Sequence, residues 1–355
     1  MRIKKLSLTE LGRGIDLPIQ ERSGIRRSDR FLGNTSLHNE REELYETVAK
    51  AVIGCRQKPL IIVDWSEIPN ATHHVLRAAL VADGRAITIY EEVHPEKKLS
   101  NPKLEKSFLR KLKRILPLKC HPIIITDAGF HNKWFREVLK LDWDYVGRVR
   151  CGKKFSKNHG EKWHKYTELF SKATSIPQYV GKVELCRTNI IETHLYLFKG
   201  KPQGRSLLNR AGKKRRDSSS MDSRKAAREA WVLASSLSGR LMEKRVIKIY
   251  KKRTQIEEGF RDLKSSRYGF SFEDSHSKKR ERIEILLLIG SLASFIAWLI
   301  GWAMEKSKQH YQFQSNTVKT RRVLSLFYLG CQTVKRKVKI PVRILETALE
   351  GLSHV

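Results

Sequence analysis

The chain of 355 residues carries 71 lysines and arginines against 37 aspartates and glutamates, a formal net charge of +34 at pH 7. This excess is larger than an ordinary cytosolic metabolic enzyme carries. The charge excess predicts a polyanionic partner. Because the cations recur along the whole chain, nucleic acid is favoured over a membrane surface. The five cysteines include no C-x2-C pair, which argues against a zinc site or a disulfide framework and predicts reduced thiols in the cytoplasm.

Residues 1–55 are polar and basic, and we expect a small helical region that contacts DNA. Short helical patterns cover Leu6–Leu11 and Ser36–Ile53. The stretch between them holds residues that interrupt helices, namely Gly12, Gly14, Pro18 and Gly24. A solvated basic face would produce the same pattern, so DNA contact by this region is one of two open interpretations.

Residues 56–150 predict the first part of an α/β core. Pro59–Asp64 is a short apolar run, rich in β-branched residues, that ends in an acid; His121–Thr126 is a second such run, followed directly by Asp127. The other predicted elements are two strands joined by an Asp-Gly turn, then a helix, a second helix and a strand: Val75–Val81, Ala86–Val93, Lys103–Leu116, Asn132–Leu141 and Tyr145–Val149.

This order of strand, hairpin, helix, strand, helix and strand is typical of an RNase H-like fold, in which helices cover a mixed sheet. Asp64 and Asp127 end the first and the fourth predicted strands. Sites of open α/β sheets form at the carboxyl ends of strands, so these two acids become candidate site residues.

The pattern changes over residues 151–229, which predict a β-rich insertion. Strands are expected at Tyr179–Cys186 and Asn189–Phe198. They are followed by a flexible loop over Lys201–Arg228, crowded with Lys, Arg, Ser and Gly, which could follow a DNA backbone.

Residues 230–310 predict the second part of the core, with a strand at Trp231–Ser235 and a long helix at Gly239–Ser266. An apolar run at residues 285–304 is long enough to cross a bilayer. We favour a buried core helix, because no targeting signal is present and the chain is basic on both sides of the run. Residues 311–355 predict a helical C-terminal region.

The most specific signal is a Y-x2-R-x3-E-x6-K pattern in the predicted long helix, formed by Tyr250, Arg253, Glu257 and Lys264. At about 100° per residue, these positions fall within an arc of about 60° and share one face. Glu258 points away from that arc. A separate apolar stripe would pack on the sheet, formed by Ile249, Ile256, Phe260 and Leu263.

Such a face suits phosphodiester chemistry. Glu257 can ligate a hard cation together with Asp64 and Asp127. The remaining members can hold DNA phosphates: Arg253, Lys264 and, through its hydroxyl group, Tyr250. A solvated helix face with i,i+4 ion pairs is the alternative interpretation.

Three segments together resemble bacterial DDE transposases: Ile61-Ile62-Val63-Asp64-Trp65-Ser66, Ile124-Ile125-Thr126-Asp127-Ala128-Gly129-Phe130 and the helix with the Y-R-E-K pattern. The combination is similar to the insertion-sequence-four family, which that pattern defines, and within it to the transposon-ten-like branch. The resemblance runs over nearly the whole chain, from Leu6-Ser7-Leu8-Thr9-Glu10-Leu11-Gly12-Arg13 to the region around Asn316-Thr317-Val318.

The resemblance implies an RNase H-like catalytic core, interrupted by a β-rich insertion, that performs cut-and-paste transposition. It implies that Asp64, Asp127 and Glu257 are catalytic and hold two Mg²⁺ ions, with Mn²⁺ as a substitute, during strand cleavage, hairpin formation and joining to target DNA. Trp231 matches a Trp that holds a base out of the stack in relatives, although an aromatic packed on the sheet is an equal alternative.

The implied partners are transposon-end DNA and target DNA, bound by a homodimer that pairs two ends in the bacterial cytoplasm, at the nucleoid. The main alternative is a catalytically silent, truncated DNA-binding relative that occupies transposon ends, since relatives usually have a longer region before the Leu-Thr-Glu-Leu-Gly element. A different RNase H-like nuclease is a third hypothesis, and a membrane protein a distant fourth.

Overall fold

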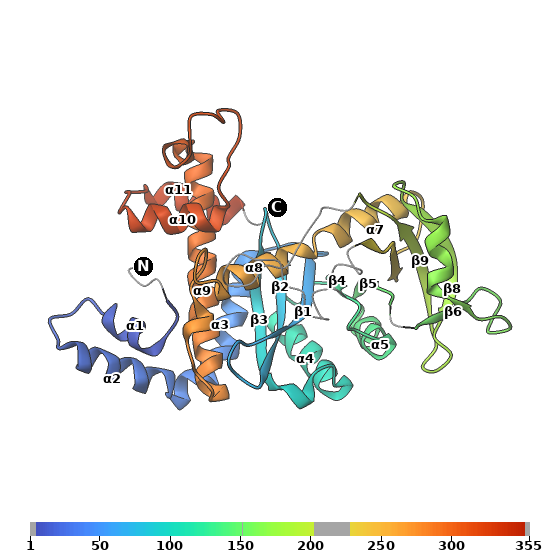
Figure 1. Cartoon of the computed structure of the whole chain (residues 1–355), viewed down its shortest axis with the longest axis horizontal. Coiled ribbons are helices and arrows are strands. Elements are labelled where there is room, and N and C mark those ends of the chain that lie inside the picture. The colour runs from blue at the N-terminus through green and yellow to red at the C-terminus, as the bar shows by residue number, and fades with distance from the viewer. Residues whose placement is uncertain (1–4, 151, 202–227, 352–355) are drawn as a thin grey trace. The chain divides into compact units, whose positions relative to one another are not determined.

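The computed structural model describes residues 5–150, 152–201 and 228–351 (Figure 1). The chain forms two compact units. We call Met1–Pro122 together with Arg253–Val355 the first unit, and Ile123–Lys252 the second unit. Apart from its two end residues, the basic loop predicted at Lys201–Arg228 lies outside the described residues.

Within the described part of the first unit, three strands pair antiparallel in the order β3-β2-β1, namely β1 Leu60–Glu67, β2 His73–Val81 and β3 Ala86–Pro95. The apolar start of β1 is fully buried, as the β-branched run predicts. The prediction that Asp64 ends this strand is wrong. The ladder continues until Glu67 lies opposite His74, so Asp64 lies inside β1, opposite Arg77.

Four longer helices of the first unit contact β3: α3 Thr35–Ile53, α4 Pro102–Ile115, α8 Thr254–Lys264 and α9 Arg280–Lys306. Helices α3 and α4 each begin directly after an Asn residue. The side chains of Asn34 and Asn101 each accept hydrogen bonds from two backbone N–H groups of the following turn. The remaining elements of this unit are α1 Leu8–Arg13, α2 Glu21–Leu32, α10 Leu326–Lys335, α11 Val342–Gly351 and the short 3₁₀ helices Glu96–Lys98, Phe272–Asp274 and Gln309–Phe313.

Helix α9 contains the apolar run. By length and composition it is the one helix among the described residues that could cross a membrane, and 56% of its apolar window is buried inside the protein. It packs against α3, α10 and β3. This is the packing of a core helix of the first unit.

The stretch between the two predicted N-terminal helices was expected to be irregular, and this expectation is wrong. Helix α2 runs through Gly24, and α1 packs on it. A Cβ atom at Gly24 would lie 2.4 Å from the carbonyl oxygen of Gly12, closer than any real contact. These glycines permit a close approach of α1 and α2 rather than breaking a helix.

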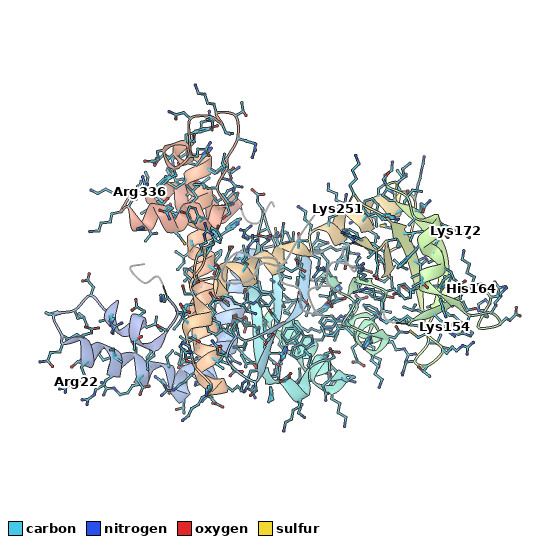
Figure 2. The ribbon with its side chains drawn as sticks, viewed as in Figure 1. Arg22, Lys154, His164, Lys172, Lys251 and Arg336 are labelled. Carbon is cyan, nitrogen blue, oxygen red and sulfur yellow. The ribbon has the colours of Figure 1, made fainter. Side chains whose placement is uncertain are left out.

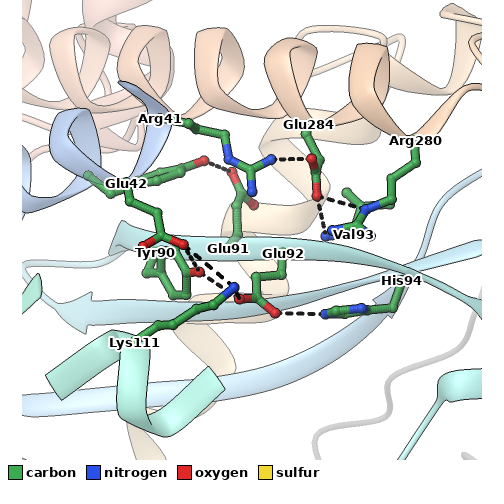
Figure 3. A network of polar contacts seen from close by, with 11 residues as sticks. Arg41, Glu42, Tyr90, Glu91, Glu92, Val93, His94, Lys111, Arg280 and Glu284 are labelled. Atoms are coloured by element: carbon green, nitrogen blue, oxygen red, sulfur yellow. Dashed lines mark hydrogen bonds and ion pairs between the residues drawn. The ribbon is translucent and has the colours of Figure 1, made fainter. Parts of the chain in front are cut away.

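Strand β3 carries a buried polar network, shown in Figure 3. Glu92 is 4% exposed and accepts hydrogen bonds from Tyr90 Oη (2.6 Å) and Lys111 Nζ (2.8 Å), and His94 Nε2 lies 2.8 Å from it. Burial alone would raise the pKa of Glu92, but its partners His94, Lys111 and Tyr90 outweigh burial and lower it to about 2. This charge can be buried because it is fully hydrogen-bonded.

The adjacent Glu91 is equally enclosed. Its carboxylate accepts hydrogen bonds from Tyr45 of α3 (2.9 Å), Ser291 of α9 (2.7 Å) and Arg77 of β2 (2.7 Å). Three elements far apart in the sequence therefore share one buried carboxylate, which couples α3 and α9 to the sheet beside Asp64.

In the described part of the second unit, the strands follow the order β4-β5-β10-β9-β8-β6-β7. They are β4 Ile123–Thr126, β5 Asp144–Arg148, β6 Lys154–Ser156, β7 His164–Lys165, β8 Gln178–Leu185, β9 Ile191–Phe198 and β10 Trp231–Ser235. β4 and β5 are parallel, whereas β10 is antiparallel to both β5 and β9. The strands of the predicted insertion thus continue a mixed sheet. Together with the helices, this confirms the predicted mixed α/β fold.

The predicted long helix Gly239–Ser266 is in fact two helices. α7 spans Met242–Lys251 and begins after Leu241, which adopts a left-handed conformation (φ 58°). Between α7 and α8, the Lys252 N–H bonds to the Ile249 carbonyl, three residues back, so the turn tightens where a continuous α-helix was expected. The second unit also contains α5 Asn132–Lys140 and the 3₁₀ helix Tyr166–Lys172.

Candidate active site

Two of the predicted acids lie in the first unit, on β1 and α8. The Asp64 side chain is 13% exposed, and its Oδ1 accepts a hydrogen bond from the backbone N–H of Trp65 at 3.0 Å. The Glu257 side chain lies in the first turn of α8 and is 43% exposed. One carboxylate is thus held in the sheet and the other lies at the surface of the helix.

Arg253 joins these two acids. Its Nη1 lies 3.6 Å from Asp64 Oδ2, and its Nη2 donates a hydrogen bond to Glu257 Oε1. The structure therefore brings Asp64 and Glu257 together around one guanidinium group. Glu258 instead pairs with Arg261 of its own helix, so the two adjacent glutamates of α8 have different partners.

Lys264, the last residue of the predicted motif, reaches back to β1. Its ammonium group donates to Ser66 Oγ at 2.8 Å and to the Glu67 carbonyl. Burial, and then the positive charge of Arg77, lower the pKa of Lys264 to about 8. Lys264 is thus anchored beside the strand that carries Asp64, a contact that the sequence did not predict.

Asp127 belongs to the second unit. It directly follows β4, and its Oδ1 accepts a hydrogen bond from the Gly129 N–H at 2.8 Å, which is an Asx-type turn. Nearby, burial and the charge of Lys153 lower the pKa of His131, whereas Asp127 raises it. Of the three predicted acids, the structure brings together Asp64 and Glu257; Asp127 lies on the other unit.

An aromatic cluster occupies the second unit where β10 meets α7. The Trp231 and Tyr250 rings meet edge to face at 5.0 Å, and Phe198 lies 5.6 Å from Trp231. Lys251 Nζ lies 4.9 Å from the Phe198 ring centroid. Tyr250 is only 3% exposed, whereas Trp231 is partly exposed.

Phe198 and Lys251 were not among the predicted site residues. Phe198 lies directly opposite Trp231 in the β9–β10 register, which is a contact between residues 33 positions apart in the sequence. Lys251 follows Tyr250 directly in the sequence, so it could have been considered from the motif itself.

The exposed side of α7 is basic. Lys244, Lys248 and Lys251 are exposed and spaced four and three residues apart, so they form one stripe along the helix. Figure 2 shows Lys251 on this helix and other basic side chains distributed around both units, including Lys172 and Arg336. The stripe ends at the aromatic cluster, because Lys251 belongs to both.

The donor chemistry of the acids fits a hard divalent cation. Carboxylate oxygens are the ligands that Mg²⁺ and Mn²⁺ prefer. Asp64 and Glu257 already share one cation, the Arg253 guanidinium group, and their carboxylates are the groups that would hold a metal ion. Within the described residues, no three His, Cys, Asp or Glu side chains are gathered in a metal-holding group.

The chain matches a known protein family. A family model described as "Transposase DDE domain" matches residues 56–296, which is more than half of the chain. No curated protein matches the chain.

Proposed function

The chain belongs to the transposase DDE domain family, and from this premise we propose that it moves a bacterial insertion sequence by cut-and-paste transposition. We place it in the insertion-sequence-four family and its transposon-ten-like branch. The observation that carries the proposal is the pairing of Asp64 and Glu257 around one cation, since both residues lie within the matched segment.

We assign the catalytic role to Asp64, Asp127 and Glu257. Their carboxylates would hold two Mg²⁺ or Mn²⁺ ions, which when bound supply the Lewis acidity for hydrolysis and transesterification of DNA phosphodiesters. The Trp65 N–H and the Gly129 N–H orient the Asp64 and Asp127 carboxylates respectively. Such fixed second partners favour a defined ligand geometry.

The DNA strand would be held by the cations of α7 and by the two cations of the motif. Lys251 and the α7 stripe lie on the exposed side of that helix and can follow a phosphate backbone. Arg253 offers a fork that suits a phosphate, and Lys264 adds positive charge beside the strand of Asp64.

A hairpin intermediate requires a distorted DNA end with a base out of the stack. We assign Trp231 as the residue that contacts this base. Its ring is partly exposed and is fixed by the buried Tyr250 and by Phe198. A rigid aromatic face of this kind can stack on an unpaired base. Tyr250 then acts mainly by orienting Trp231, with its hydroxyl group as a further donor to phosphate.

The same proposal includes the partners. Transposon-end DNA and target DNA are the substrates, a homodimer pairs two ends, and the protein acts in the bacterial cytoplasm at the nucleoid. We propose that residues 1–55 contact the end sequence, that residues 56–150 and 230–310 form the catalytic core around an insertion at 151–229, and that residues 311–355 form a helical C-terminal region.

The test is cleavage of a linear DNA that carries the element's own end, with Mg²⁺ or with EDTA, resolved on a denaturing gel. We expect the wild-type protein to produce a nick and then a hairpin only with Mg²⁺. Glu257→Ala should reduce both by more than about 100-fold, because even the outer partners of a metal ligand contribute 10- to 100-fold.

Glu258→Ala is the matched control, since it removes the same charge from the same helix and should leave cleavage unchanged. Binding of the end without cleavage by the wild-type protein in Mg²⁺ would overturn the enzyme assignment. That outcome would favour the catalytically silent relative that occupies transposon ends.

A further inference from the structure

We propose that Arg253 is a resident counter-cation of the metal site: it neutralises Asp64 and Glu257 in the protein without DNA, and DNA phosphate draws it away so that metal can bind. This inference rests on the proposed function, because it takes the two acids as metal ligands. It adds a regulatory role for a residue that was otherwise assigned only to DNA binding.

The geometry supports a bridging role. Arg253 is 19% exposed, and its two Nη atoms face different carboxylates, Nη1 toward Asp64 Oδ2 at 3.6 Å and Nη2 toward Glu257 Oε1. An ordinary i,i+4 pair on a helix surface would engage Glu257 alone. The additional contact with Asp64 on β1 makes the guanidinium a link between strand and helix.

Electrostatics explains why such a link is useful. Two carboxylates brought together repel, and a cation between them compensates for their charge. A guanidinium group can do so because its planar fork presents several N–H donors at once. The arrangement thereby keeps both acids in place before any metal arrives.

The same cation must oppose metal binding. A guanidinium group and a divalent ion compete for the same carboxylate oxygens, and their positive charges repel. The protein without DNA should therefore bind metal more weakly than its carboxylates alone would allow.

DNA resolves this competition. A phosphate offers Arg253 a bidentate partner of the kind that guanidinium groups prefer. Once Arg253 pairs with phosphate, Asp64 and Glu257 are available to metal. By thermodynamic reciprocity, metal binding then strengthens DNA binding by the same factor. Metal thus loads where the substrate lies, which limits unproductive cleavage.

The first experiment measures Mn²⁺ affinity of the full-length, DNA-free protein by titration calorimetry or electron paramagnetic resonance. We expect Arg253→Ala and the closer-fitting Arg253→Gln to tighten Mn²⁺ binding about tenfold, which corresponds to about 1.4 kcal/mol. Arg261, which pairs with Glu258, lies in α8, the helix that Arg253 precedes; Arg261→Ala removes an equal charge and should leave the affinity unchanged.

A second pair of variants separates this inference from the proposed function. Asp64→Asn and Glu257→Gln should each weaken Mn²⁺ binding in the otherwise wild-type protein. If they do not, the proposed metal site is wrong and the inference fails with it. If they do, but both Arg253 variants bind Mn²⁺ as weakly as the wild type or more weakly, the counter-cation role alone is overturned.

The coupling between metal binding and DNA binding can be measured separately. Fluorescence anisotropy of a short duplex, with Ca²⁺ or with EDTA at constant ionic strength, should show several-fold tighter DNA binding with Ca²⁺ for the wild-type protein. Arg253→Gln should lose this difference. Equal enhancement by Ca²⁺ in both proteins would contradict the exchange of Arg253 between carboxylates and phosphate.

Discussion

Trp65, the residue after Asp64, contacts a carboxyl group in an unusual environment. Glu105 of α4 is 5% exposed, and its Oε1 accepts one hydrogen bond, from Trp65 Nε1 at 3.4 Å. Burial raises the pKa of Glu105 to about 7, and the Trp65 bond lowers it only in part. Trp65 follows Asp64 directly, so Glu105 is hydrogen-bonded to the strand that carries Asp64.

Ionisation of Glu105 makes the stability of the folded protein depend on pH. Because the pKa of Glu105 is raised from 4.5 to about 7 on folding, the folded state holds a proton that the unfolded state releases between these values. Stability contributed by this group is complete below about pH 4.5 and is lost as the pH rises through 7.

We predict that Glu105→Gln, which cannot ionise, stabilises the protein at pH 8 by up to about 3 kcal/mol, since one pKa unit corresponds to about 1.4 kcal/mol. At pH 4.5 the variant and the wild type should unfold alike. Urea unfolding across this range would measure the effect, with the exposed Glu96→Gln as control. A difference that is independent of pH would contradict the assignment to ionisation.

At the scale of the element, local patterns predicted most strands and helices. The strand Trp231–Ser235 has the predicted bounds, and α4 agrees within one residue at each end, because alternation, apolar runs and Asn caps are local signals. Helix α2 was missed because Gly24 reads as a helix breaker unless its partner Gly12 is known. The close approach of α1 and α2 depends on both segments together, and a short window of sequence contains only one of them.

In the candidate site, too, the local spacing of residues could be predicted, whereas contacts between elements could not. The motif spacing placed Arg253 and Glu257 within one turn, which is local geometry. The contacts of Arg253 with Asp64 and of Lys264 with Ser66 depend on how α8 packs on β1. Likewise, Phe198 meets Trp231 through strand register. The positions of these residues along their helix could be predicted from the sequence, but their contact partners could not.

The crossing of α9 and α10 shows how strongly packing can depend on a missing side chain. A Cβ atom at Gly330 of α10 would lie 1.8 Å from the Ala297 carbonyl oxygen, and one at Gly301 of α9 would lie 1.9 Å from the Leu326 carbonyl oxygen. Both clashes are with backbone, which cannot rotate away. The two helices can pack at this distance only with glycine at these positions.

Gly330→Ala should therefore destabilise the protein by about 2 kcal/mol or more, as overpacking of a rigid contact does. Gly259→Ala is a matched helical control. Its Cβ atom would meet only the Ala86 carbonyl oxygen, at an ordinary 3.8 Å, and alanine should gain about 0.5–1 kcal/mol over glycine in a helix. Opposite shifts of the urea midpoint are expected; an unchanged midpoint for Gly330→Ala would show that the helices can separate.

For the molecule as a whole, the central question is whether the net charge of +34 acts as a diffuse field or through placed contacts. Basic side chains occur on both units, among them Arg22 and Arg336 on the first and Lys172 and Lys251 on the second (Figure 2). A diffuse field attracts DNA to every face, whereas a placed contact neutralises a particular phosphate and releases its counterion. The two mechanisms differ in how they respond to removal of equal charge from different surfaces.

We predict that the α7 stripe makes placed contacts. The triple variant Lys244→Ala, Lys248→Ala, Lys251→Ala should reduce the slope of log affinity against log salt by about 0.9 per lost phosphate contact, up to about 2.7. The control removes three exposed cations of α4, with Lys103, Arg110 and Lys113 changed to alanine. Anisotropy titrations of one duplex across a salt series would compare them. Equal losses in both variants would mean that total charge, not its position on α7, holds the DNA; a loss confined to the α7 variant would place the DNA path along this helix, toward Trp231.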